Sequence, residues 1–200
     1  MNVVDEGGFG VPKFNSIQNK KILNIAAGFL PLVGSDFGPS VKVYNYDPLA
    51  TSCKDKDFEL RENLKAKFSD LIMGLRKIDN VKYYFEEEEV KREVKKDSID
   101  ILICVSPYGF TLVTQWVHER LKIGAYIIII GNKANKYITH GENIFEPPLQ
   151  QCYCKVLWPF DTFAMDVATK LLKKYPSNVS GLGRKTTLDL ASVFLKTTLR

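Results

Sequence analysis

Apolar and polar positions follow two different patterns that alternate along the chain. Short runs that are apolar at most positions are typical of strands buried on both faces of a parallel sheet. Such runs occupy residues 21–26, 41–46, 81–85, 99–105 and 125–130. Apolar residues at helical spacing occupy residues 57–77, 111–122 and 160–175. The alternation predicts an α/β fold with an open, doubly wound, mostly parallel, Rossmann-like sheet and helices on both faces.

Other segments complete this predicted organisation. Gly124 is expected to end the helix over residues 111–122. Residues 86–96 predict a short exposed helix or a loop, and residues 153–158 and 193–197 are further strand-like segments. Residues 1–18 show no clear periodicity and are interpreted as a leader arm, followed by one domain over residues 19–200.

Composition narrows the classes of protein that fit. The 200 residues are 45% apolar and 26% charged, which is ordinary for a globular domain. No apolar run approaches the roughly 20 residues that span a bilayer, so membrane insertion is not expected. The N-terminus lacks the pattern of a signal peptide, which predicts a cytosolic protein or a fragment of a larger one. The four cysteines are expected to be free thiols, and no metal site is expected, because Cys152 and Cys154 lack a second ligand pair.

Positive charge is concentrated in the second half of the chain. Residues 121–200 carry 11 Lys and Arg against 5 Asp and Glu, whereas the first 120 residues are nearly balanced. Lys170, Lys173 and Lys174 share the outer face of a predicted helix. The excess either keeps the protein in solution or attracts an anionic partner, such as nucleic acid, an acidic protein or a phosphorylated substrate.

The ends of the first two predicted strands carry the residues of a nucleoside pocket. The first run ends in Ala26, Ala27 and Gly28, and the second ends in Asp47 about twenty residues later. Small residues let the backbone approach a ligand, and a carboxylate accepts hydrogen bonds from ribose hydroxyls. The alternative interpretations are a turn glycine at Gly28 and a turn cap at Asp47.

Two later loops would reach the same edge of the sheet, on the substrate side. The first follows the fourth strand and comprises Ser106, Pro107, Tyr108, Gly109 and Phe110; its alternative role is simple loop packing. The second follows the fifth strand, where Asn135, Lys136 and Tyr137 are candidates to contact a phosphate and stack on a base. His118 and His140 are the candidate general bases, but His118 is expected to be a surface residue in mid-helix.

These motifs, in this order, resemble those of class I S-adenosylmethionine-dependent methyltransferases. More narrowly, the segments NIAAG, YNYDPLA, DILICVSPYGF and LKIGAYIIIIGNKANKY, within residues 20–138, resemble the methyltransferase-like C-terminal domains of bacterial polymorphic toxins. The resemblance implies S-adenosylmethionine bound at Ala26, Ala27, Gly28 and Asp47, with Glu86 near its adenine. It implies a methyl acceptor held at the loop that follows the fourth strand, with Ser106 and Tyr108 as the catalytic residues and Pro107 and Phe110 as substrate contacts.

The toxin resemblance also has implications for partners and location. It implies delivery as the C-terminal part of a secreted protein, action in a cytoplasm, and an immunity protein that binds the domain. Three departures from the family pattern are the isolated Gly28, Asn24 in place of an acid, and Ser106 in place of Asn or Asp. They keep open a second function, a catalytically inactive Rossmann-like module that binds nucleic acid or an acidic protein. A third, a toxin with nuclease chemistry, needs a cluster of His, Lys or carboxylates that the sequence does not reveal.

Overall fold

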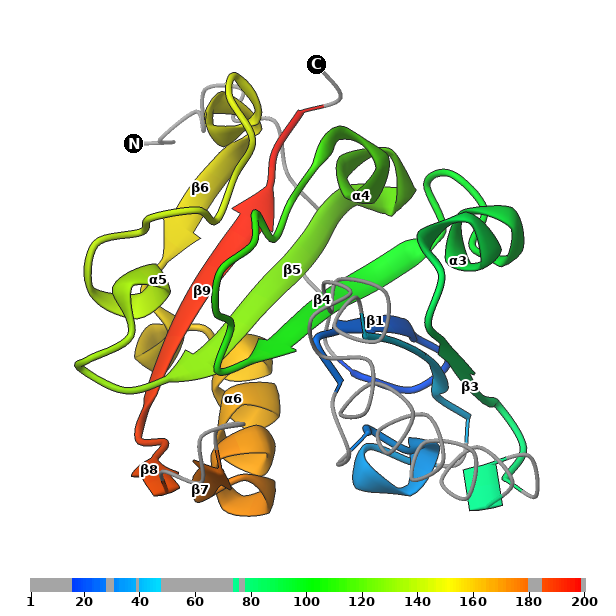
Figure 1. Ribbon diagram of the computed structural model, residues 1–200, viewed down its shortest axis with the longest axis horizontal. Coiled ribbons are helices and arrows are strands. Elements are labelled where there is room, and N and C mark those ends of the chain that lie inside the picture. The colour runs from blue at the N-terminus through cyan, green and yellow to red at the C-terminus, as the bar shows by residue number, and fades with distance from the viewer. Residues whose placement is uncertain are drawn as a thin grey trace, which may run out of the picture.

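A seven-stranded sheet organises the computed structural model, which describes residues 16–27, 31–38, 40–47, 74–75, 78–179 and 185–198 (Figure 1). The strand order is β3-β2-β1-β4-β5-β9-β6. The strands are β1 (Lys21–Ile25), β2 (Lys42–Tyr46), β3 (Val81–Tyr84), β4 (Ile99–Val105), β5 (Leu121–Gly131), β6 (Tyr153–Val156) and β9 (Leu190–Lys196).

The first five strands are parallel and confirm the predicted fold class. Their order, 3-2-1-4-5, is that of a doubly wound sheet. Strand β9 pairs with β5 in the antiparallel sense, and β6 pairs antiparallel with β9. The strand order reverses where β1 meets β4, so this is the switch point beside which ligands bind in such sheets.

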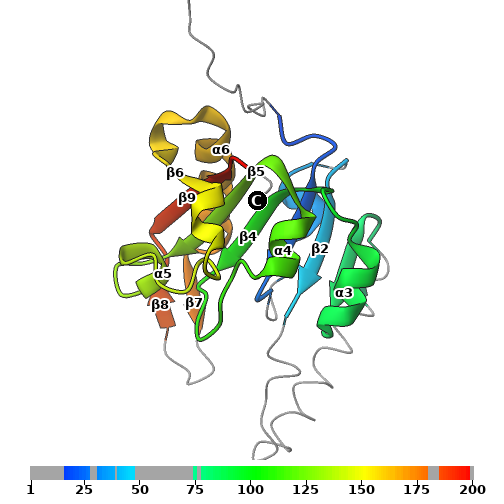
Figure 2. The ribbon, with the colours of Figure 1, turned by 90° about the horizontal axis from the view of Figure 1, so that it is seen from above.

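Each face of the sheet has its own core. Helices lie over both faces (Figure 2). On one face α6 (Thr162–Lys174) packs Phe163, Val167 and Leu171 against the strands, as its apolar spacing predicts. On the other face lie α3 (Glu87–Glu93) and α4 (Gln115–Arg120), which bury Val90 and Val117. Both faces of the sheet are therefore covered by helices.

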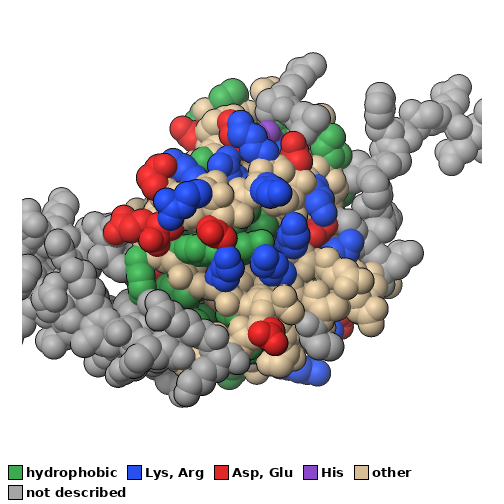
Figure 3. Space-filling model, turned by 90° about the vertical axis from the view of Figure 1, so that its right-hand side faces the viewer, with side chains coloured by type: hydrophobic (Ala, Val, Ile, Leu, Met, Phe, Trp, Pro, Cys, Tyr) green, Lys and Arg blue, Asp and Glu red, His purple; other side chains and the backbone are tan. Residues whose placement is uncertain are grey.

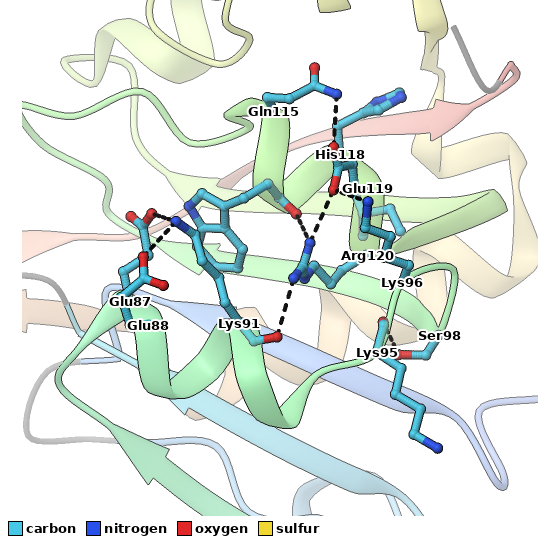
Figure 4. Close-up of polar contacts among 12 residues, drawn as sticks. Glu87, Glu88, Lys91, Lys95, Lys96, Ser98, Gln115, His118, Glu119 and Arg120 are labelled. Atoms are coloured by element: carbon cyan, nitrogen blue, oxygen red, sulfur yellow. Dashed lines mark hydrogen bonds and ion pairs between the residues drawn. The ribbon is translucent and has the colours of Figure 1, made fainter.

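Arg120 joins the two helices of the second face (Figure 4). Its guanidinium donates to the backbone carbonyl of Lys91, at 3.2 Å, and to the carboxylate of Glu119, at 3.3 Å. The Lys91 carbonyl lies in the last turn of α3, where a cation is favoured by the helix dipole. The contact fixes α4 against α3 over the β4 side of the sheet.

The helix expected over residues 111–122 is shorter than predicted. Only Gln115–Arg120 is α-helical, and β5 begins directly at Leu121. Gly124 does not end a helix; it lies within β5 at a φ of 80°, where the register between β4 and β5 shifts. The i, i+4 spacing of Val113, Val117 and Leu121 misled the prediction, because all three are buried although only Val117 is helical.

The leader arm predicted over residues 1–18 includes a residue that belongs to the packed domain. Ile17 is 7% exposed and packs in the core on the α6 face, so the packed domain includes residues before 19. Most of the predicted helix over residues 57–77 lies outside the described residues. Several short elements were not predicted, namely η1 (Gly34–Asp36), α5 (Lys136–Thr139), η3 (Leu149–Cys152), η4 (Trp158–Phe160), β7 (Ser177–Val179) and β8 (Lys185–Thr187). In the described part of the chain, none of the helices has the length and apolarity needed to cross a bilayer.

Lys196 is a buried lysine that ties the antiparallel part of the sheet to α4. It is 1% exposed, and its ammonium donates to the carbonyls of His118 and Leu121, both at 2.8 Å. Burial lowers the pKa of Lys196, which shows the cost of desolvating its charge. The ammonium thus gives a donor to two carbonyls at the end of α4, of which that of His118 also accepts from Leu121 N.

Replacing this ammonium tests its contribution to stability. We expect Lys196→Met to lower the free energy of unfolding by about 1–3 kcal/mol, because two buried carbonyls each lose a charged donor. Denaturant unfolding measures the change, with Lys173→Met, on the exposed face of α6, as the matched control within about 0.5 kcal/mol of the parent. Equal stability of Lys196→Met and the parent would contradict the proposed role of the ammonium.

Candidate functional site

The carboxyl ends of β3, β2, β1, β4 and β5 lie side by side in that order. Backbone hydrogen bonds continue the ladders past the strands, from Ala27 N to Tyr46 O (3.3 Å), from Asp47 N to Tyr84 O (3.2 Å) and from Ser106 N to Ile130 O (2.7 Å). Ile25 of β1 pairs with Cys104 of β4, which places Ala26 beside the end of β4. The structure therefore brings Ala26, Ala27, Asp47 and Ser106 together at the switch point, as the sequence predicts.

Two non-glycine residues at this edge have left-handed backbone conformations. Ala26 has a φ of 59° and Ser106 has a φ of 54°, and they follow adjacent strands. This region costs an L-residue roughly 1–2 kcal/mol, so it persists only where the surroundings impose it. Strained residues of this kind gather at functional sites, and here both turn the chain away from the sheet at the switch point. Gly28, the third residue of the predicted turn, lies outside the described residues.

Asp47 follows β2 but is more buried than a residue on an open rim. Its exposed fraction is only 1%. Its negative charge affects groups on neighbouring strands. The pKa values of Cys104, at the end of β4, and Tyr83, on β3, are raised mainly by burial and secondly by the charge of Asp47. The carboxylate thus adds negative charge to this edge, which favours a ligand group that donates hydrogen bonds.

A second carboxylate lies at the end of the next strand. Glu86 is the N-cap residue of α3 and is exposed, so both the predicted ligand contact and the solvated alternative remain compatible with its position. Burial, followed by the charges of Glu87, Asp47 and Glu86, raises the pKa of Tyr46 to about 12. Tyr46 is therefore a neutral phenol between the acids that follow β2 and β3.

Two buried asparagines form a polar pair that the sequence interpretation did not use as a site. Asn24 of β1 and Asn45 of β2 are register partners, and Asn24 Nδ2 donates to Asn45 Oδ1 at 2.9 Å. Asn24 is 2% exposed, and its Oδ1 has no hydrogen-bond partner among the described residues. An unpaired buried acceptor two residues before Ala26 marks a place where a ligand donor would be favourable. The polar residues Asn24 and Asn45 inside two otherwise apolar strands were the sequence feature that could have indicated this pair.

The loop from Ser106 to Phe110 is held in place by α5. Asn135 donates from Nδ2 to the carbonyl of Pro107 at 3.1 Å and caps α5 by accepting from Tyr137 N. The Tyr137 hydroxyl accepts from Phe110 N at 3.0 Å and donates to Phe110 O. Both ends of the loop are thereby fixed by side chains that follow β5.

This arrangement revises three predicted substrate contacts, Pro107, Asn135 and Tyr137, because Pro107 is also buried and its carbonyl accepts from Asn135. Tyr137 is 4% exposed and cannot stack on an external base, and both side-chain ends of Asn135 are engaged with the backbone. Tyr108, in contrast, is 89% exposed, and Lys136 is also exposed. The fixed loop therefore presents an exposed aromatic ring.

The histidines and cysteines do not form a catalytic cluster among the described residues, and Cys104, at the end of β4, is buried. His118 was expected at the surface, but it is 3% exposed and its Nδ1 lies 2.8 Å from the hydroxyl of Tyr153. His140 is exposed in the chain after α5. Three cysteines are free thiols, as predicted, and Cys53 lies outside the described residues. The described part of the chain contains no cluster of side chains suited to a metal ion.

The predicted basic face of α6 is largely neutralised. Lys170 pairs with Asp166 at 2.9 Å, and Lys174 pairs with Asp36 at 2.6 Å. On the α3 side of the molecule, basic and acidic side chains also lie next to each other (Figure 3), as in the 2.6 Å pair of Lys82 and Glu93. Paired surface charges attract a polyanion less than free ones do, so the α6 lysines are a weak nucleic-acid surface.

Comparisons with known proteins find similar solved structures. No family model and no curated protein matches the chain. It is similar to the solved structure of an rRNA methylase from Streptococcus thermophilus (14% identity, TM-score 0.45, 91% of this chain and 90% of that one). It is also similar to a putative methyltransferase from Streptococcus mutans in complex with SAH (15% identity, TM-score 0.42, 90% and 89%). A third is a precorrin-8w decarboxylase from Methanobacterium thermoautotrophicum (13% identity, TM-score 0.44, 90% and 83%). At these values the strand order and register, rather than the superpositions, establish the architecture.

The support that α5 gives to the loop can be measured directly. We expect Tyr137→Phe to speed amide hydrogen exchange at Phe110 and to lower stability by about 1 kcal/mol, because the bridging hydroxyl is lost. Tyr108→Phe, which removes an exposed hydroxyl from the same loop, is the matched control and leaves both quantities unchanged. Unaltered exchange at Phe110 in Tyr137→Phe would show that the loop is fixed by other contacts.

Proposed function

We propose that the protein is an S-adenosylmethionine-dependent methyltransferase. In this proposal the cofactor lies along the ends of β1 and β2, and its methyl group faces an acceptor at the Ser106–Phe110 loop. The observation that carries the proposal is the meeting of a small-residue turn, a buried carboxylate and a fixed aromatic loop at the switch point of the sheet.

The residues present fit the cofactor. Ala26 and Ala27 have no side chain large enough to keep a ligand from the backbone. Asp47 supplies an acceptor suited to ribose hydroxyls, and Asn24 Oδ1 is a buried acceptor with no hydrogen-bond partner among the described residues. Bound S-adenosylmethionine would supply an electrophilic methyl group, whose bond to sulfur breaks with the electron pair remaining on sulfur as the acceptor nucleophile bonds to carbon.

The chain's own part in such a transfer is positioning. The Ser106 hydroxyl can hydrogen-bond an acceptor group, and the Tyr108 ring can lie flat against a planar acceptor. The described edge contains no histidine, and a displacement of this kind depends mainly on orientation rather than on a strong base. Holding the loop rigidly before the acceptor arrives lowers the entropic cost of that orientation.

Nucleic acid is the acceptor class that we propose. Tyr108 offers an exposed ring, and Lys133 is an exposed cation on the segment after β5, where Lys136 pairs with Glu142 at 3.6 Å. Aromatic stacking combined with phosphate contacts is how proteins hold unpaired bases. The competing function, a catalytically inactive binding module, would use the same groups without a bound cofactor.

Calorimetry with S-adenosylmethionine and S-adenosylhomocysteine tests the proposal. The parent protein is expected to bind both, and Asp47→Asn to weaken each by at least about tenfold, or 1.4 kcal/mol, because a carboxylate acceptor is lost without a change of shape. Glu88→Gln, an exposed change on α3, is the matched control and should bind as the parent does. Absence of binding, together with salt-sensitive binding of RNA, would favour the inactive module.

A toxin role is a separate proposal that rests on the Pro-Tyr-Gly-Phe and Asn-Lys-Tyr segments of the sequence. It includes delivery with a secreted protein, action in a cytoplasm and an immunity protein. Induced expression in bacterial cells is expected to stop growth, and Asp47→Asn to relieve the arrest at equal protein level. Normal growth with the parent protein present and folded would refute this role and leave methyl transfer unaffected.

A further inference from the structure

Asn45 is a buried side chain that uses its whole hydrogen-bonding capacity at the start of the candidate site. Its Oδ1 accepts from Asn24 Nδ2 at 2.9 Å and from Leu32 N at 3.0 Å. Its Nδ2 donates to Leu32 O at 2.9 Å and to Lys82 O at 3.3 Å. Asn45 is 0% exposed, so water does not compete for these bonds.

The bonds to Leu32 reproduce those of a paired strand. One side-chain amide engages both the N–H and the C=O of Leu32, which is itself 0% exposed. Leu32 belongs to the connection between β1 and β2, five residues after Ala27. That connection contains no long helix in its described part, where only the short η1 is regular. The amide of Asn45 thus does the anchoring that a packed helix does elsewhere in a doubly wound sheet.

A second anchor holds the far side of the same segment. Asp36, in η1, forms an ion pair with Lys174 of α6 at 2.6 Å, and its Oδ2 accepts from Val33 N at 2.8 Å. The segment is therefore fixed both to the sheet, through Asn45, and to α6. The buried anchor is the stronger of the two, because the pair with Lys174 is accessible to solvent and salt.

The position of Asn45 links this anchor to the ligand edge. Asn45 lies two residues before Asp47, which follows β2, and Asn24 lies two residues before Ala26, where the left-handed backbone turns the chain. The Asn24–Asn45 bond therefore joins β1 to β2 one pleat before the two predicted cofactor contacts. Displacing Asn45 would move the connection and the strand end that carries the carboxylate together.

We infer that Asn45 is a positioning residue for the cofactor: its amide holds the β1–β2 connection against the sheet so that the small-residue turn and Asp47 face one ligand. The inference rests on the proposed function. Asn45 touches no ligand in this arrangement, since all its polar atoms are engaged by the protein. Asn45 affects binding only through its hydrogen bonds to Leu32 and Asn24.

The test compares variants of similar stability. Asn45→Ala removes the amide, and Val43→Ala removes only apolar packing from the same face of β2, where Val43 is also 0% exposed. By calorimetry, S-adenosylhomocysteine affinity should fall at least tenfold in Asn45→Ala and stay within about twofold of the parent in Val43→Ala. Amide hydrogen exchange at Leu32 should rise in Asn45→Ala alone. If Asn45→Ala fails to fold, Asn45→Ser, which keeps one polar contact, should lose at least threefold in affinity.

The outcomes separate the inference from the proposed function. Parent-like affinity in a folded Asn45 variant, while the parent binds S-adenosylhomocysteine, overturns the positioning role and leaves the methyltransferase proposal standing. Equal losses in Val43→Ala and Asn45→Ala also overturn it, because they show an effect of stability alone. Absence of S-adenosylhomocysteine binding by the parent overturns the proposed function, and the positioning role with it.

Discussion

The parallel pairing of β1 with β2 on one side and with β4 on the other is the constraint on which the rest of the structure depends. Asn24 is the register partner of both Asn45 and Ile103, so three strands end at nearly the same level. A slip of one residue would move a strand end by about 3.3 Å and turn its side chains to the other face. The shared register therefore brings the turn, the carboxylate and the loop to one place.

The strained residues at this edge are stabilised by the same pairing. Ala26 and Ser106 have positive φ, each at a cost of order 1 kcal/mol. Each lies against a backbone bond that continues the ladder, from Ala27 to Tyr46 and from Ser106 to Ile130. These bonds are made by the protein alone. The edge is thus shaped before a ligand binds, which reduces the ordering cost of binding.

The segments that surround the edge divide between support and presentation. Asn45 and Asn135, the N-cap residue of α5, donate hydrogen bonds to the backbone of neighbouring loops, whereas Tyr108 is exposed. Close packing of α5 on β5 requires Gly131, because a Cβ there would lie 2.8 Å from Ile138 Cγ1. Rigid support beneath one exposed ring suits a site that must orient a planar partner.

Local periodicity was enough to predict the strands and the doubly wound class, since burial on both faces leaves a continuous apolar run such as Ile99–Val105. It also placed Asp47 and Ser106 at strand ends. It failed where burial comes from distant contacts: His118 is enclosed by Tyr153, and Tyr137 turns inward to Phe110. Strand order, the antiparallel place of β9 and the Asn24–Asn45 pair were decided by tertiary structure, because they join residues far apart in the chain and no local pattern encodes which strands become neighbours.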